Sequence, residues 1–196
     1  MRKAINIPFL LFFPFFAMAQ KSLSGELHFN HLFAKDGMPE GTVTSIAQDK
    51  EGYMWIGTEK GLVRYDGYSP KVYNLGIENP YQQDIRIIYL DREDRIWAGG
   101  KYGVLLLYDR AEDRFIQYKL NSPAPDSSSW GIYDILEDHH GNLWLLNYNF
   151  INKKELLQRF DLTTNKFIKY DITEKGSRYI NVTRFTNFLE DDKGAV

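Results

Sequence analysis

The sequence of 196 residues contains no cysteine, which excludes a disulfide scaffold, a thiolate metal site and a cysteine nucleophile. It contains only four histidines, and none of them lies in an HExxH motif or a comparable metal-ligand spacing. There is no run rich in lysine and arginine, and the formal net charge is −2. A chain of this charge lacks the electrostatic footprint of nucleic-acid binding. We therefore expect no metal, no cofactor, no catalytic residue and no nucleic-acid contact in this segment.

Long apolar runs are also missing, apart from one short stretch at the N-terminus. Residues 1–3 carry two positive charges, residues 4–16 are mostly apolar, and residues 17–19 form a small-x-small cleavage signal. The apolar stretch is shorter than the roughly 20 residues that a membrane-spanning helix needs. We predict a secretory signal peptide over residues 1–19, which would leave Gln20 at the start of the exported chain.

The sequence is rich in aromatic residues, and its tryptophans mark an internal repeat. Trp55, Trp97 and Trp144 are 42 and 47 residues apart, and each follows an aspartate by six positions. A period of about 40 to 50 residues that contains several short strands is typical of a β-propeller. A fourth copy begins near Phe188, so we expect the chain to hold only part of a propeller.

Each copy divides into four strands. The first strand alternates apolar and polar residues, and an Asp-x-x-Gly turn links it to the tryptophan strand. We predict an all-β fold, a β-propeller of four-stranded antiparallel blades, with about three blades and the start of a fourth. Within residues 20–196, the predicted segments are an outer closing strand over 28–33, blades over 42–73, 84–118 and 130–170, and the start of a fourth blade over 180–196.

The repeated residues have a structural interpretation. The aspartates at positions 49, 91, 138 and 191 recur because a turn recurs, and we expect them to cap backbone amides. In the second copy Asp94 replaces the turn glycine. We expect the repeated tryptophans to pack between blades, and Gly57 to allow a neighbouring blade to approach closely.

The first copy also resembles a known family. The run from Ile46 to Asp66, with Asp49, Gly52 and Trp55 in it, is similar to the two-component regulator propeller repeat, and Asp36-Gly37-Met38-Pro39 resembles the usual start of such proteins. The resemblance implies the periplasmic sensing region of a hybrid two-component histidine kinase. It further implies a glycan or oligosaccharide ligand, homodimerisation through the full-length protein, and a membrane helix, kinase and often DNA-binding modules further along the parent chain.

Ligands of propellers usually bind at the turns between second and third strands and at the links between blades. Aromatic, amide and charged side chains there suit sugars, because a sugar ring stacks on an aromatic side chain and sugar hydroxyls form paired hydrogen bonds with amide and charged groups. The candidate ligand-binding residues are Glu59, Lys60, Tyr81, Lys101, Tyr102, Trp130, Tyr148, Asn149, Arg178 and Tyr179.

Two other functions remain open from the sequence. A secreted propeller can be a lyase or hydrolase whose catalytic residues lie in later blades, or a scaffold or adhesin without a kinase. The reading frame after Val196 would separate these alternatives from a sensor.

Overall fold

The computed structural model describes residues 31–77, 83–119 and 129–170. Within them the only complete helix is the short 3-10 helix η1 (Ala34–Asp36), and nearly all other regular structure is β-strand. Every strand belongs to one compact unit, Leu32–Val196. The all-β prediction is therefore confirmed. In the described part of the chain, no helix has the length and apolar character that crossing a membrane requires.

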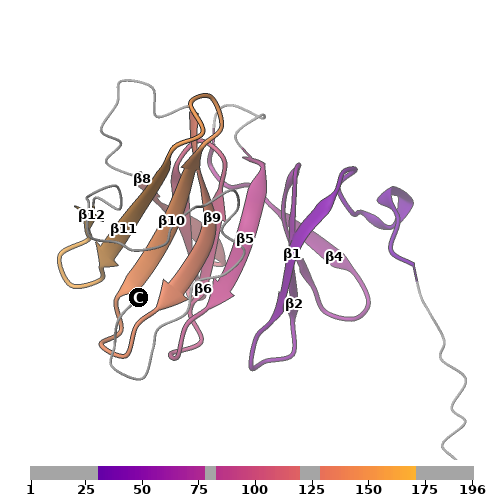
Figure 1. The fold of residues 1–196 in the computed structure, drawn as a ribbon. Helices are drawn as coiled ribbons and strands as arrows, with labels where there is room; N and C mark the ends of the chain where they lie inside the picture. The colour runs from indigo at the N-terminus through magenta and orange to yellow at the C-terminus, as the bar shows by residue number, and fades with distance from the viewer. Residues whose placement is uncertain (1–30, 78–82, 120–128, 171–196) are drawn as a thin grey trace, which may run out of the picture. The chain divides into compact units, whose positions relative to one another are not determined.

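The strands form three separate four-stranded sheets, each antiparallel and each ordered as in the sequence (Figure 1). We call them blades 1, 2 and 3. Blade 1 contains β1 (Val43–Gln48), β2 (Met54–Thr58), β3 (Gly61–Tyr65) and β4 (Pro70–Tyr73). Blade 2 contains β5 (Ile85–Leu90), β6 (Ile96–Gly100), β7 (Val104–Asp109) and β8 (Arg114–Lys119). Blade 3 contains β9 (Trp130–Glu137), β10 (Leu143–Asn149), β11 (Glu155–Asp161) and β12 (Lys166–Tyr170).

Some predicted segments fall outside these residues. The signal peptide over 1–19 and the fourth blade over 180–196 lie wholly in parts of the chain that the structure does not describe. The closing strand over 28–33 lies there in part, and its described residues, 31–33, are not in a strand. These three assignments stay predictions.

The aspartate of each copy ties the first turn of its blade to the tryptophan of the second strand. In blade 1, Asp49 Oδ1 accepts hydrogen bonds from the amides of Glu51 and Tyr53, and Asp49 Oδ2 accepts one of 2.8 Å from Trp55 Nε1. The same 2.8 Å indole bond reaches Asp91 from Trp97, and Asp138 from Trp144. The turn-capping prediction is confirmed for Asp49, Asp91 and Asp138, and the bond to the indole extends it. Asp191 lies outside the described residues.

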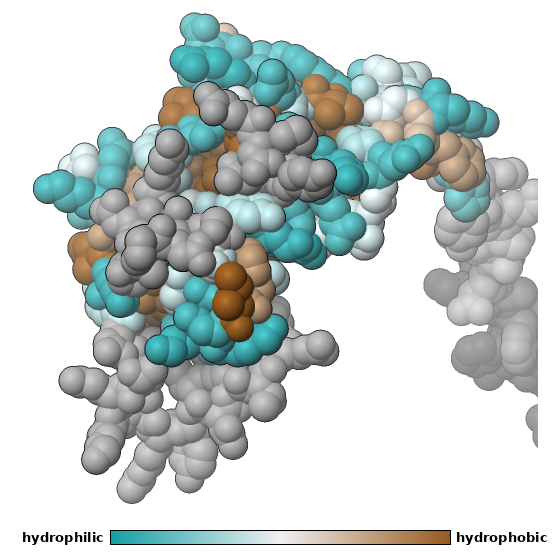
Figure 2. All heavy atoms as spheres, turned by 90° about the horizontal axis from the view of Figure 1, so that it is seen from above, coloured by the Kyte–Doolittle hydropathy of each residue, from teal (hydrophilic) through white to brown (hydrophobic). Residues whose placement is uncertain are grey.

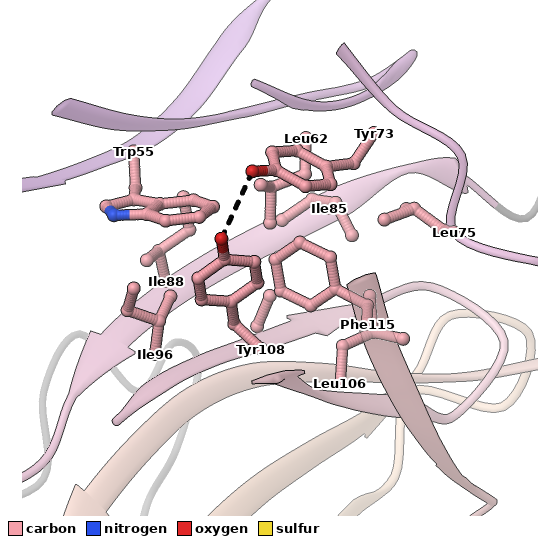
Figure 3. Packing of buried hydrophobic residues seen from close by; sticks show 11 residues of the cluster. Trp55, Leu62, Tyr73, Leu75, Ile85, Ile88, Ile96, Leu106, Tyr108 and Phe115 are labelled. Atoms are coloured by element: carbon pink, nitrogen blue, oxygen red, sulfur yellow. Dashed lines mark hydrogen bonds between the residues drawn. The ribbon is translucent and has the colours of Figure 1, made fainter. Parts of the chain in front are cut away.

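Adjacent blades pack through their tryptophan faces. Trp55 of blade 1 is fully buried against Tyr108 and Phe115 of blade 2, with ring centroids 4.6 and 6.0 Å apart (Figure 3). Trp97 of blade 2 is likewise fully buried, in a cluster with Phe160 of blade 3. Burying aromatic rings of this size is the main favourable term in such an interface. The predicted packing between blades is confirmed for Trp55 and Trp97. Trp144 is half-buried, with its ring against Tyr170 of its own blade, so packing on a further blade stays a prediction for it.

Glycine on the second strand allows this close approach. A Cβ added at Gly57 would lie 2.9 Å from Ile85 Cγ2 of blade 2, closer than carbon atoms pack. A Cβ at Gly99 would lie 2.6 Å from Ile132 Cγ2 of blade 3. The expectation for Gly57 is confirmed, and Gly99 allows the same close approach between blades 2 and 3.

The opposite face of blade 1 is exposed where its counterparts are buried. Ile46 is 58% exposed, whereas the residues at the same place in blades 2 and 3, Ile88 and Ile135, are 5% and 3% exposed. Those two are covered by the preceding blade. The face that carries Ile46 is therefore an interblade face with no preceding blade among the described residues.

Candidate functional site

All three blades share a β-bulge at the same place in their first strand. The register of β1 with β2 skips Thr44, that of β5 with β6 skips Arg86, and that of β9 with β10 skips Tyr133. A bulge leaves one residue outside the ladder and redirects its side chain. The fold therefore presents one side chain per blade at a repeated position near the start of the first strand.

Two neighbouring positions are also equivalent from blade to blade. In each blade, a residue at or just before the start of the first strand lies opposite a residue near or just after the end of the second strand. The amide of Glu59 donates a hydrogen bond of 3.2 Å to the carbonyl oxygen of Thr42, and the amide of Lys101 donates one of 2.9 Å to that of Asp84. In blade 3, Gly131 faces Tyr148 by strand pairing.

Chemistry at these positions differs in every blade, although the residues that build the blade repeat. The aspartate and tryptophan recur three times, whereas the bulge holds threonine, arginine and tyrosine in turn. Packing needs the recurring residues, so the differing ones are free to serve recognition. We call six of the differing residues the inner-strand site: Glu59, Asp84, Arg86, Lys101, Tyr133 and Tyr148.

The inner-strand site lies at the opposite end of the blades from the Asp-Trp turns. In Figure 1 the β10–β11 turn, next to Tyr148, is at the upper end of blade 3 and the β9–β10 turn is at the lower end. Figure 2 looks down onto the upper end, where hydrophilic residues make up most of the described surface that is visible.

Charges in the site centre on Asp84, whose side chain is only 7% exposed. Its Oδ2 accepts a hydrogen bond of 2.6 Å from Arg86 Nη2 and is 2.6 Å from Lys101 Nζ. Glu59 Oε1 is 3.8 Å from the same arginine nitrogen. One buried carboxylate thus holds two cations beside each other.

Two tyrosines flank the charges. The rings of Tyr133 and Tyr148 meet edge to face, with centroids 5.8 Å apart. Burial raises the pKa of the Tyr133 hydroxyl, although Arg86 and Lys101 act in the opposite direction. The hydroxyl therefore stays protonated at neutral pH and can both donate and accept hydrogen bonds.

The structure brings three of the predicted ligand-binding residues into the site: Glu59, Lys101 and Tyr148. Lys60 lies in the same exposed turn as Glu59, where its amide donates to Thr58 Oγ1. Three others cannot be placed, because they lie in undescribed stretches of the chain. These are Tyr81, Arg178 and Tyr179.

The remaining predicted residues have structural roles. Tyr102 has a positive φ of 67° in the β6–β7 turn, and its ring meets Phe150 edge to face. Asn149 is buried, and its Oδ1 accepts bonds from two amides of the β10–β11 turn. Trp130 begins β9 and is only 7% exposed, so its ring offers little surface for stacking. Ligand binding by these residues stays a prediction.

Three site residues, Asp84, Arg86 and Tyr133, escaped the sequence analysis. They stand at or just before the first strands, which we interpreted as packing elements rather than as part of a surface. The bulge cannot be recognised from alternation alone. Aligning the three copies on Ile46, Ile88 and Ile135 would have revealed that the residue two places earlier changes chemical type in each blade.

A metal centre finds no support in the described stretches. They contain no group of three or more histidine, aspartate or glutamate side chains placed to hold an ion. The rings of His139 and His140 lie 3.7 Å apart and are tilted by 44° in the exposed β9–β10 turn, at the end away from the inner-strand site.

Comparison with known proteins shows which fold the chain shares with them. Residues 37–60 match the two component regulator propeller family. Histidine kinase P4 of Formosa agariphila is 32% identical over 75 residues, which make up 38% of this chain and 6% of that protein. The extracellular domain of BT3049 from B. thetaiotaomicron, described as a hybrid two component system, superposes with a TM-score of 0.57 at 22% identity. The superposition covers 72% of this chain and 20% of that chain.

A virginiamycin B lyase from Staphylococcus aureus also superposes, with a TM-score of 0.53 at 15% identity, over 70% of this chain and 43% of that chain. At such identities the likeness extends to the fold alone. The chain spans only a minor part of each of these proteins. Residues 37–60 of the chain match the two component regulator propeller repeat, and the fold is built from β-propeller blades.

Proposed function

We propose that this chain is the ligand-sensing part of a two-component sensor, and that the inner-strand site binds an oligosaccharide. The single observation that carries the proposal is the change of chemistry at equivalent positions of three otherwise similar blades. Binding rather than catalysis is the role of the segment. Its similarity to extracellular domains of hybrid two-component systems supports the sensor assignment.

The side chains of the site suit sugars. Tyr133 and Tyr148 offer ring faces and hydroxyls, and a sugar ring has an apolar face that stacks on an aromatic ring. Asp84, Arg86 and Lys101 supply acceptors and donors within a few ångströms of each other, which matches the neighbouring hydroxyls of a sugar.

The rest of the proposal concerns the parent protein. Export by the N-terminal leader would place the segment in the periplasm, and a helix further along the chain would anchor the parent in the inner membrane. Ligand binding would alter a homodimer of the full-length protein and so regulate a histidine kinase. The segment itself needs no cofactor for this role.

The test is calorimetric titration of the full-length protein with a panel of oligosaccharides, together with measurement of the protein's autophosphorylation in the presence of each sugar. We expect at least one oligosaccharide to bind and to change autophosphorylation without being consumed. Tyr148→Ala should weaken that binding, whereas Tyr68→Ala should not, because Tyr68 is 92% exposed in the β3–β4 turn. Chemical conversion of the sugar, or binding unaffected by Tyr148→Ala, would contradict the proposal.

A further inference from the structure

The cation pair of the inner-strand site has more hydrogen-bonding capacity than its carboxylate uses. Arg86 Nη2 and Lys101 Nζ both contact the same oxygen, Asp84 Oδ2. Arginine carries five N–H donors and lysine three. Since the side chains of Arg86 and Lys101 are 22% and 31% exposed, each keeps donors that reach the surface of the site.

Two buried atoms of the same cluster have no hydrogen-bond partner. They are Asp84 Oδ1 and Arg86 Nε. Unpaired buried polar atoms cost stability, so folded proteins keep few of them. Asp84 is itself only 5% exposed. The cluster is thus a preformed but incompletely satisfied polar site, of a kind that structural ion pairs seldom leave.

Two cations of the cluster share one buried carboxylate. Arg86 and Lys101 both contact Asp84, whereas the second carboxylate, that of Glu59, is 42% exposed and lies 3.8 Å from Arg86. Near the tyrosines, Lys153 Nζ lies 6.0 Å from the centroid of the Tyr148 ring and Glu155 pairs with Tyr148 between β10 and β11, so charges of both signs are present there.

We propose that the inner-strand site recognises an acidic sugar: Arg86 and Lys101 bind the carboxylate of a uronic acid residue whose ring lies against Tyr133. The planar guanidinium of an arginine matches a carboxylate, and the lysine adds a charge-assisted bond. Tyr133 is 37% exposed beside these cations, which gives the sugar ring an aromatic surface. Asp84 acts as the positioning residue that holds both cations in place. This inference rests on the proposed function and narrows its ligand class.

The test compares three probes by calorimetry on the full-length protein: trigalacturonic acid, a neutral galactose trisaccharide and glutarate. We expect trigalacturonic acid to bind tightest, with an affinity that falls as salt rises. Arg86→Gln and Lys101→Gln should each lower that affinity about tenfold or more, the usual effect of losing a hydrogen bond to a charged group. Lys166→Gln is the matched control, because Lys166 is an exposed lysine on β12.

Circular dichroism shows whether each variant is folded. A folded Lys101→Gln protein with unchanged affinity overturns the inference. Equal binding of the neutral and acidic trisaccharides overturns it as well, but leaves the oligosaccharide proposal standing. Glutarate binding as tightly as trigalacturonic acid would show that the sugar ring adds nothing to affinity, and this too overturns the inference. If no oligosaccharide of either class binds, the proposed function itself fails.

Discussion

Substituting Gly57 by alanine tests how closely blades 1 and 2 approach. The added Cβ would lie 2.9 Å from Ile85 Cγ2 and 3.3 Å from Thr44 Oγ1. Ile85 is 1% exposed and packs in the shared core, so it has little room to move. Gly57 is absent from the positive-φ residues of the chain, so alanine there tests packing without backbone strain.

The expected cost of Gly57→Ala is about 1–3 kcal/mol of stability, the usual range for overpacking a well-packed core. Ile85→Ala alone should cost about 2–5 kcal/mol, because it leaves a cavity. In the double variant the new methyl group enters the space that Ile85 has vacated. The Cβ of Ile85 would then be 3.5 Å away, an ordinary contact, so the double variant should lose less than the sum of the two singles. A coupling of about 1 kcal/mol or more is expected for residues in direct contact.

Hydrogen exchange of peptides from β2 and β5 in the full-length protein measures these free energies locally. Gly100→Ala provides the contrast, because its Cβ would lie 2.4 Å from the backbone oxygen of Asp84, which no side-chain truncation can remove. Gly57→Ala and Ile85→Ala acting additively would refute the reasoning, and so would a Gly57→Ala protein as stable as the wild type.

Two further predictions concern carboxylates. Asp91→Ala should lower the free energy of unfolding by at least about 3 kcal/mol, because the buried indole N–H of Trp97 and two turn amides lose their acceptor. Thermal unfolding measures this change, and a decrease below about 1 kcal/mol would contradict the prediction. A hydrogen bond from Lys71 and others from the hydroxyls of Tyr73 and Tyr108 hold the pKa of Asp113 well below its usual range. A depressed carboxyl pKa stabilises the folded state above the unfolded pKa of about 4, and this contribution should be lost as pH falls further. Hydrogen exchange of β4 and β8 between pH 2 and 5, corrected for the intrinsic exchange rate, should show this loss below about pH 4, and Asp113→Asn should abolish it. An identical pH dependence in that variant would exclude the ion pair as the cause.

The architecture could be predicted from sequence because its cause is repeated. A turn aspartate six residues before a tryptophan recurs three times, and the same hydrogen bond forms each time. Short strands between such turns leave few alternative pairings. Even the irregular turn was visible in advance: Asp94 stands where glycine is expected, and it adopts the positive φ of 60° that the turn requires.

The candidate site was only half predictable, because it depends on a bulge rather than on a motif. Glu59, Lys101 and Tyr148 were found from their place in turns or at strand ends. Arg86 and Tyr133 lie inside strands, and strict alternation assigns them a face that the bulge then changes. Trp130 was a candidate because it stands outside the repeat, and the structure adds that its ring is only 7% exposed.

The central claim is that one end of the blades recognises ligand while the Asp-Trp turns at the other end maintain the fold. Hydrogen exchange of the full-length protein, with and without saturating trigalacturonic acid, tests it most directly. We expect added protection in peptides that cover residues 84–86, 101–103 and 131–133, and none in the turns at 49–52 and 91–95. Protection confined to those turns, or spread evenly over both ends, would contradict it.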